Sequence, residues 1–272
     1  MTTVAQAIAQ SGLAAIDAQV LLAHALGVPR TWLVAHADEA LAPDTAAAFA
    51  ALADRRRGGE PVAYLTGTRE FFGLTLAVTP AVLIPRPETE TLVEFALARL
   101  PVDAAARVLD LGTGSGAIAL AVAHARPRAQ VVGADRSAEA LAVARANARR
   151  LGLRNVEFVA ADWFDGIAAG RFDVVVGNPP YIAAADAHLG QGDLRFEPRS
   201  ALTPGGDGLG ALRCIVTAAP RHLAAGATLA VEHGHDQAGA VAAMFVATGY
   251  TDVAAVRDLA GIVRVTAGVR GR

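Results

Sequence analysis

Residues 107–125 read RVLDLGTGSGAIALAVAHA, in which an apolar run passes through a glycine-rich turn into an alanine-rich helical pattern. The same alternation continues downstream, with apolar runs at 130–135 (QVVGAD), 156–162 (VEFVAAD) and 172–178 (FDVVVGN) and a helical pattern at 137–152. Strands that alternate with helices predict right-handed crossovers and a parallel sheet. This part of the chain therefore predicts an α/β fold.

The C-terminal part predicts three further strands. After a long polar loop at 179–210 we expect a helix, a strand over 227–234 (ATLAVEHG), a second helix, and two strands near 251–256 and 262–267. The last two strands lie too close together for a helical crossover, so at least one of them should be antiparallel.

The N-terminal part has a different pattern. Residues 1–80 carry alanine-rich helical patterns broken by glycine and proline, with Pro43 well placed to open a helix. EFFGLTLAV at 70–78 suggests a short hairpin, and two prolines force VLIPRPETE at 82–90 into an extended connection. We therefore expect a small helical domain with a hairpin linker at 1–80 and the α/β domain at 81–272.

Composition limits the possible partners. With 24 basic and 26 acidic residues the net charge is −2, which gives no general attraction to nucleic-acid phosphates. The densest basic run, Arg55-Arg56-Arg57, is expected to be a solvated helix end. No uncharged stretch reaches the roughly 18 apolar residues of a membrane span, and the N-terminus lacks the charged start of a secretory signal. We therefore expect a cytoplasmic protein without direct nucleic-acid or membrane binding.

The glycine-rich turn predicts a nucleotide-like cofactor. Gly112, Thr113, Gly114, Ser115 and Gly116 follow the first strand directly, at the sheet edge where open α/β sheets bind ligands. Glycines allow close approach of a ligand to the backbone and positive φ angles.

Asp135 ends the second strand, where a carboxylate can accept hydrogen bonds from both ribose hydroxyls. The spacing of Gly112, Gly114 and Ala117 also fits the dinucleotide fingerprint G-x-G-x-x-G/A, so this element alone leaves a dehydrogenase and a methyltransferase equally open. Asp162 and Trp163 follow the third strand, where an acid can accept from the adenine amino group and an aromatic ring can cover the base; a tryptophan that simply packs in the core is an equal alternative.

A second motif, Asn178-Pro179-Pro180-Tyr181, follows the fourth strand at the same predicted edge. An amide or aromatic amine is a weak nucleophile, so an enzyme must position it. The Asn178 side-chain oxygen and the Pro179 carbonyl can accept its two N–H bonds, Tyr181 can stack on the planar group, and the prolines stiffen the loop. The motif predicts methyl transfer to a planar NH2 group, which adenine and a glutamine amide both present.

Together these motifs resemble the PrmC or HemK family of glutamine N5-methyltransferases, which modify class I release factors. The resemblance spans nearly the whole chain, through EPVAYLTGTREFFGLTL, VLIPRPETETLVE, LDLGTGSGAIALA, LGLRNVEFVAADWF, NPPYI, DLRFEPRSAL, EHGHDQ and DLAGIVRVTAG.

The resemblance implies a Rossmann-like class I S-adenosylmethionine-dependent methyltransferase domain with a seven-stranded sheet, preceded by a helical domain that helps to dock the substrate. S-adenosylmethionine is the implied cofactor and S-adenosylhomocysteine its product. Gly112 to Gly116, Asp135, Trp163 and Asn178 would contact the cofactor, and Asn178 to Tyr181 would hold the glutamine of a Gly-Gly-Gln loop in a class I release factor.

Other readings remain to be compared with the structure. An adenine N6 methyltransferase acting on nucleic acid would need a basic groove, and a noncatalytic S-adenosylmethionine-binding module would not need an intact N-P-P-Y. His233 and His235 lack the companions of a metal site, so we expect none. We expect Cys214 to be a buried small hydrophobe, and Asp193–Arg199 to form a substrate-facing lid.

Overall fold

The computed structural model describes residues 2–167 and 171–271. Residue 1, at the start of the predicted helical domain, and residue 272, at the end of the predicted α/β domain, lie outside the described residues. The chain divides into two compact units, which are described separately below. One comprises Met1–Thr68 with Gln191–Phe196, and the other comprises Arg69–Gly190 with Glu197–Arg272. No helix of the part described is long and apolar enough to cross a membrane.

The first unit is helical. Its helices are α1 (Val4–Gln10), α2 (Ala15–Leu26), α3 (Arg30–Ala35), α4 (Pro43–Arg57) and α5 (Val62–Thr66), with the short 3-10 helix η3 (Gly192–Phe196) from later in the chain. Thr3 closes a capping box with Gln6 at the start of α1, and Pro43 opens α4 as predicted. Apolar side chains from all five N-terminal helices form one core, which includes Val4, Leu22, Leu33, Phe49 and Leu65.

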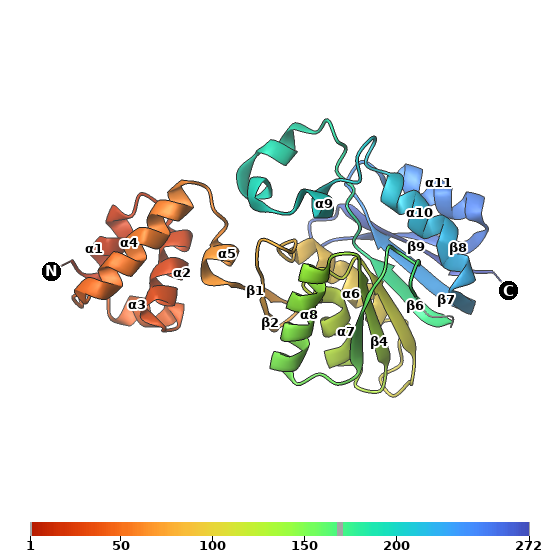
Figure 1. Ribbon diagram of the computed structural model, residues 1–272, viewed down its shortest axis with the longest axis horizontal. Helices are drawn as coiled ribbons and strands as arrows, with labels where there is room; N and C mark the ends of the chain where they lie inside the picture. Colours follow the sequence, from red (N-terminus) through yellow and green to blue (C-terminus); the bar gives the residue numbers. More distant parts are fainter. Residues whose placement is uncertain (1, 168–170, 272) are drawn as a thin grey trace. The chain divides into compact units, whose positions relative to one another are not determined.

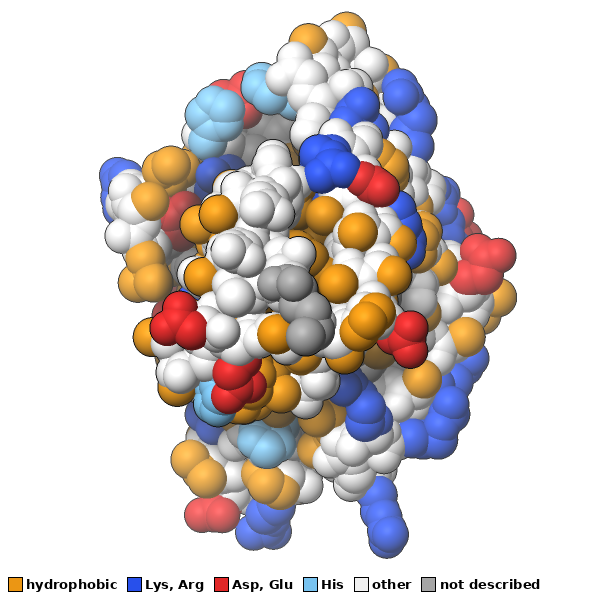
Figure 2. Space-filling model, turned by 90° about the vertical axis from the view of Figure 1, so that its left-hand side faces the viewer, with side chains coloured by type: hydrophobic (Ala, Val, Ile, Leu, Met, Phe, Trp, Pro, Cys, Tyr) orange, Lys and Arg blue, Asp and Glu red, His pale blue; other side chains and the backbone are white. Residues whose placement is uncertain are grey.

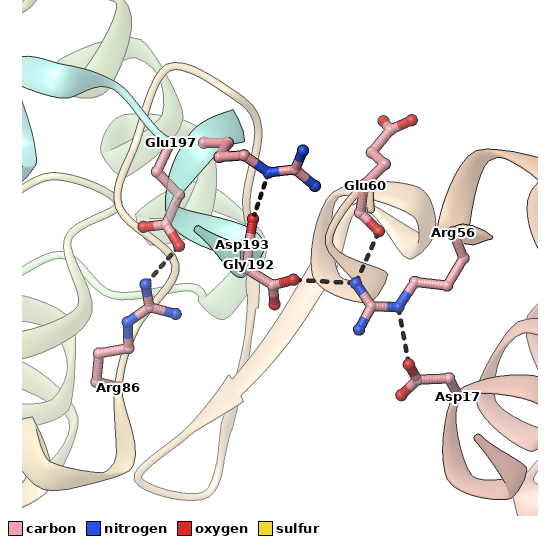
Figure 3. Close-up of polar contacts among 8 residues, drawn as sticks. Asp17, Arg56, Glu60, Arg86, Gly192, Asp193 and Glu197 are labelled. Atoms are coloured by element: carbon pink, nitrogen blue, oxygen red, sulfur yellow. Dashed lines mark hydrogen bonds and ion pairs between the residues drawn. The ribbon is translucent and has the colours of Figure 1, made fainter. Parts of the chain in front are cut away.

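The arginine run at the end of α4 is only partly a solvated helix end. Arg55 and Arg57 are exposed, but Arg56 is half-buried between two carboxylates of the same unit. Its Nε donates to Asp17 over 2.8 Å and its Nη1 donates to Asp193 over 2.9 Å (Figure 3). The prediction was wrong for Arg56 because residues 191–196, far away in the sequence, supply one of its partners.

The second unit begins with a hairpin and an extended connection. β1 (Thr68–Phe71) and β2 (Leu74–Ala77) form the predicted two-stranded sheet, and the connection that follows leads into η1 (Pro87–Thr89) and α6 (Glu90–Leu97). The side-chain amide of Asn147 joins this hairpin to the main fold, because it accepts from Ala77 N and donates to Ala77 O and Ser115 O.

The main sheet has seven strands within the described ranges, in the order β5-β4-β3-β6-β7-β9-β8. They are β3 (Arg107–Leu111), β4 (Gln130–Asp135), β5 (Val156–Ala160), β6 (Phe172–Gly177), β7 (Leu223–Glu232), β8 (Tyr250–Arg257) and β9 (Val263–Arg270). β3 to β7 are parallel, while β9 pairs antiparallel with both β7 and β8. The predicted fold class and the antiparallel late strand are confirmed.

Helices cover both faces of this sheet (Figure 1). Alternate residues of one strand enter opposite cores: Val174 and Val176 of β6 pack with α6 and α7 (Ala117–Ala125), and Val175 packs with the helices of the other face. The remaining elements are α8 (Ala138–Leu151), η2 (Ala187–Gly190), α9 (Arg199–Leu202), α10 (Gly210–Ala218), η4 (Ala219–Arg221) and α11 (Ala238–Thr248). Both faces of the sheet are therefore apolar and covered by helices, which explains why its strands are hydrophobic along nearly their whole length.

Cys214 differs from its prediction. It lies on the exposed side of α10, whereas Leu212, Ile215 and Val216 of the same helix are buried. A helix turns by about 100° per residue, so a cysteine between buried neighbours in sequence can still point into solvent.

Candidate active site

The strand register brings the predicted motifs to one edge of the sheet. Leu111, the last residue of β3, pairs with Ala134 of β4 on one side and Gly177 of β6 on the other, and Gly177 pairs with Val231 of β7. The residues that follow these four in the chain are Gly112, Asp135, Asn178 and Glu232. Because all four strands are parallel, their carboxyl ends meet at this edge.

The glycine turn has the backbone conformation expected from its sequence. The φ angles of Gly112, Gly114 and Gly116 are 69°, 55° and 85°, in the left-handed region that favours glycine. Asp110, fully buried below the turn, accepts from the Thr113 hydroxyl over 2.6 Å and from Ala119 N over 3.2 Å. These bonds hold the turn against the start of α7.

Replacing Gly116 by alanine tests the turn. A Cβ there would lie 2.9 Å from Leu120 Cδ1 and would hold a side chain at a φ of 85°, so the substitution is expected to lower the free energy of unfolding by about 1–3 kcal/mol. Urea denaturation measures this. The control is Gly239→Ala, where the added Cβ meets open space inside α11 and the free energy of unfolding should stay equal or rise slightly. Equal losses in both variants would contradict the proposed strain at Gly116.

Asp135 is tied to the glycine turn itself. Its Oδ2 accepts from Gly114 N and its Oδ1 accepts from Ser137 N, both over 2.9 Å. Each carboxylate oxygen has a second lone pair, so two acceptor positions remain for hydroxyl donors. Asp135 therefore fixes the turn and can bind a ribose at the same time.

A cavity of about 500 Å³ lies over this edge. Of the predicted site residues it is lined by Gly112, Gly114, Asp135, Asp162, Trp163, Asn178 and Pro180. Thr113, Ser115, Gly116, Pro179 and Tyr181 do not line it. The side chains of Thr113 and Ser115 are buried and point away from the cavity.

The cavity wall suits a nucleoside that carries a positive charge. Three acidic side chains, Asp135, Glu139 and Asp162, face one basic side chain, Arg136, which leaves a net charge of −2. Trp163, in the turn after β5, has a φ of 54°, and its indole lies 3.6 Å from where a Cβ of Gly112 would be. A bulky residue at positive φ is uncommon and marks a site held by its surroundings. The residues present thus fit S-adenosylmethionine, whose sulfonium is cationic.

Asn178 and Tyr181 are each held by a residue that the sequence did not single out. Asn178 Nδ2 donates to the Thr89 hydroxyl over 3.1 Å, and the Tyr181 hydroxyl donates to Glu232 Oε1 over 3.3 Å. Gln237 Nε2 donates to the Tyr181 carbonyl over 2.9 Å. The loop after β6 is therefore fixed from η1, from β7 and from the start of α11.

The connection at 82–90 is fixed to Glu197 within the second unit. The Arg86 guanidinium pairs with the carboxylate of Glu197, whose side chain is fully buried (Figure 3). Glu197 also accepts from Ile84 N over 3.4 Å. The prediction of an extended connection is wrong for 87–90, because Pro87 opens the 3-10 helix η1 and Glu90 begins α6. Only the fold shows the charged partner of Arg86, which lies 111 residues away.

Burial changes the acid strength of two carboxyl groups at this edge. It raises the pKa of Asp110 to about 7, opposed by the Thr113 hydroxyl and Ala119 N–H. It also raises the pKa of Glu232 to about 7, opposed by the hydroxyls of Thr89 and Tyr181 and by the charge of Arg264. Burial raises the pKa of Tyr181 as well, with the negative charge of Glu232 as the next cause. Tyr181 is therefore a neutral hydrogen-bond donor.

The histidines after β7 do not gather metal ligands. His233 is buried, and its Nε2 lies 2.9 Å from the Thr266 hydroxyl while its Nδ1 lies 2.9 Å from the Gly234 carbonyl. Among the residues that the structure describes, no group of three or more His, Cys, Asp or Glu side chains could hold a metal ion.

Family models match both parts of the chain. The methyltransferase small domain matches residues 89–209, which contain the glycine turn and N-P-P-Y. The PrmC N-terminal domain matches residues 2–67. Solved structures share the fold: a methyltransferase from Pyrococcus furiosus has a TM-score of 0.56 at 19% identity over 80% of this chain and 98% of that one. The match to the methyltransferase small domain, together with the glycine turn, the acid at the next strand end and a cavity that fits the cofactor, identifies an S-adenosylmethionine-dependent methyltransferase.

Relatives identify the family within that class. The release factor glutamine methyltransferase of Bordetella pertussis is 53% identical over 98% of this chain and 99% of its own length. The protein of the same description from Escherichia coli K12 is 46% identical over 93% of this chain and 91% of its own. The chain belongs to the release factor glutamine methyltransferase family, and S-adenosylmethionine is its methyl donor. The predicted family, enzyme class and cofactor are confirmed.

Proposed function

We propose that this enzyme methylates the side-chain amide nitrogen of the glutamine in the Gly-Gly-Gln loop of class I release factors. The observation that carries the proposal is the placement of Asn178 at the end of β6, on the wall of the cavity that Gly112 and Asp135 also line. With Nδ2 bound to Thr89, Asn178 Oδ1 is left to accept an N–H of the substrate amide.

The proposed chemistry depends on positioning. Bound S-adenosylmethionine supplies an electrophilic methyl group, and S-adenosylhomocysteine is the product. Asn178 Oδ1 and the Pro179 carbonyl accept the two N–H bonds of the glutamine amide, which turns its nitrogen lone pair toward the methyl carbon. As the nitrogen gains the methyl group it loses one of these two N–H protons. Pro180 stiffens the loop and Tyr181 packs on the planar amide, with its hydroxyl fixed by Glu232.

The remaining site residues are assigned to the cofactor. In this proposal the turn Gly112, Thr113, Gly114, Ser115 and Gly116 holds the methionine part, Asp135 binds the ribose hydroxyls, and Asp162 and Trp163 bind and cover the adenine. The cavity lining supports the direct contacts of Gly112, Gly114, Asp135, Asp162 and Trp163. The burial of Thr113 and Ser115 favours a supporting role for those two side chains, with ligand contact through backbone groups.

The helical domain at 1–80 is proposed to dock the release factor, while the domain at 81–272 carries out the transfer. Residues 193–199, which follow the N-P-P-Y loop in the chain, are proposed to form a substrate-facing lid. Because release factors work on ribosomes, we place the reaction in the cytoplasm.

A nucleic-acid amine is the competing substrate. The 16S rRNA N2 G1207 methyltransferase of Thermus thermophilus shares this fold with a TM-score of 0.56 at 19% identity over 75% of this chain and 50% of its own, so fold alone does not choose the substrate. Acidic and basic side chains both lie on the face drawn in Figure 2, in keeping with the net charge of −2. Neither the mixture of charges on this face nor the net charge favours a nucleic-acid groove.

Mass spectrometry after incubation with S-adenosylmethionine tests the substrate. The expected result is a mass gain of one CH2 group on the release factor, located on the Gly-Gly-Gln peptide. A release factor with Gln→Ala in that loop and adenine-containing DNA should both stay unmodified. Methylation of the Gln→Ala protein or of the DNA would overturn the glutamine assignment but leave the fold and the cofactor in place.

A further inference from the structure

Two wall segments of the cofactor cavity, residues 80–83 and 198–204, lie outside the main sheet. All of the first segment and most of the second line the cavity. The first contains no helix or strand, and the second contains only the single turn of α9. Asp135, by contrast, ends β4, and Asn178 directly follows β6, so the sheet holds both of them. The wall segments need a different support.

Glu197 connects the two wall segments. It directly precedes the second segment, and its side chain is fully buried. Its Oε1 pairs with the Arg86 guanidinium, and its Oε2 accepts from Ile84 N over 3.4 Å (Figure 3). Both of these partners lie just after the first segment in the chain. One carboxylate therefore ties the two segments together.

The second wall segment is also bound to the catalytic loop. Ile182 N donates to Leu202 O over 3.0 Å, and Ile182 directly follows Tyr181 of the N-P-P-Y motif. The side chain of Leu202 is buried, which fixes α9 in the second unit. The second segment therefore has a fixed place, and Glu197 holds the first segment to it.

An ion pair suits this connection. A buried carboxylate without its cation is costly, so Glu197 keeps the half-buried Arg86 from turning into solvent. The guanidinium is planar and carries five N–H donors, so it fixes the angle of the contact as well as its length. A cavity whose wall is in place in only part of the molecules binds its ligand with a Kd that is raised by the inverse of that fraction.

We propose that Arg86 and Glu197 are positioning residues for the cofactor, because they hold the wall segments in the arrangement that binds S-adenosylmethionine. Neither side chain lines the cavity, so both act through the segments beside them. The inference goes beyond the proposed reaction and does not depend on which NH2 group is methylated.

Arg86→Met removes the guanidinium and keeps an unbranched apolar side chain. Calorimetry should give a Kd for S-adenosylmethionine about 10-fold above that of the wild type, as expected if about one molecule in ten has both wall segments in place. The KM for S-adenosylmethionine should rise in parallel, and saturating cofactor should recover most of kcat. An unchanged Kd would overturn the proposal.

Hydrogen exchange without cofactor shows whether the wall itself has loosened. Amides of both wall segments should exchange faster in Arg86→Met than in the wild type, and S-adenosylmethionine should slow them again. The Ile84 N–H, whose recorded acceptor is Glu197, should also exchange faster. A raised Kd with wild-type exchange in both segments would contradict the proposal.

Arg264→Met is the matched control for a broken buried ion pair. Arg264 pairs with Asp258 over 3.2 Å, and these side chains are 21% and 4% exposed, close to the 29% and 0% of Arg86 and Glu197. Neither Arg264 nor Asp258 lines the cavity. The control should therefore lower the melting temperature to a similar extent but leave the Kd for S-adenosylmethionine as in the wild type. Equal increases of Kd in both variants would overturn the proposal, because general destabilisation would then explain them.

A double variant separates positioning from stability. Arg86→Met combined with Glu197→Leu leaves no charge buried at this contact, so the melting temperature should return toward that of the wild type. The connection between the wall segments is still missing, so the Kd for S-adenosylmethionine should stay raised. A double variant that regains both stability and affinity would refute the positioning role.

The double variant also decides the question if Arg86→Met does not fold, because a raised Kd at a wild-type melting temperature supports the proposal and a wild-type Kd overturns it. Calorimetry and hydrogen exchange need no release factor. Both therefore stay readable if that protein proves not to be methylated.

Discussion

Replacing Asn178 by alanine is expected to lower kcat for glutamine methylation by about 10³-fold. The substitution removes the oxygen that accepts a substrate N–H, and it removes the Nδ2 donor to Thr89. Without that acceptor the amide nitrogen is neither polarised nor aimed at the methyl carbon. Single-turnover methylation of the release factor measures the loss.

The same variant should bind S-adenosylmethionine nearly as well as the wild type. Asn178 is one of many residues that line the cavity, and the glycine turn and Asp135 remain. Calorimetry on the purified variant gives this affinity, and its melting temperature reports whether the loop after β6 is intact. An Asn178→Ala enzyme with substantial activity would rule out the proposed mechanism.

Replacing Asp135 by alanine should weaken S-adenosylmethionine binding by about 100-fold, since hydrogen bonds to a charged group contribute about 1.5–3 kcal/mol each. Two effects combine. The ribose hydroxyls lose their acceptor, and Gly114 N and Ser137 N lose the carboxylate that fixes the turn. Saturating cofactor should recover much of kcat, because the N-P-P-Y loop is untouched.

Glu139→Ala is the matched comparison for Asp135. It removes the same charge from the wall of the same cavity, but its side chain is exposed and makes no hydrogen bond to the turn that the structure records. Calorimetry should therefore show a much smaller loss of affinity. Equal losses would mean that Asp135 contributes only its charge, contrary to the proposed ribose contact.

The sequence predicted those parts of the site whose signals are local. GTGSG needs positive φ at its glycines, Asp135 ends an apolar strand, and Asn178 begins N-P-P-Y, so each could be recognised from a few neighbouring residues. The alternation of strands and helices then placed all three at one sheet edge, which the register confirms.

The supporting residues could not be predicted in this way. Thr89 lies 89 residues from Asn178, and Tyr181 lies 51 residues from Glu232, so only the tertiary fold brings them together. Thr89 and Glu232 do not stand out locally: Thr89 lies two residues after Pro87, and Glu232 ends an ordinary apolar strand. A buried carboxyl at a strand end is visible only once the helices covering it are in place.

Because Gln191–Phe196 belong to the helical unit, that unit is encoded by two separate stretches of the gene. Those six residues are encoded in the middle of the methyltransferase sequence, yet their Asp193 binds Arg56 near the end of α4. A gene fusion or recombination that exchanged only the first 68 codons would separate the two halves of this ion pair. The helical unit therefore cannot be exchanged as one continuous stretch of sequence. We expect a substitution at position 56 to be accompanied by a compensating substitution at position 193.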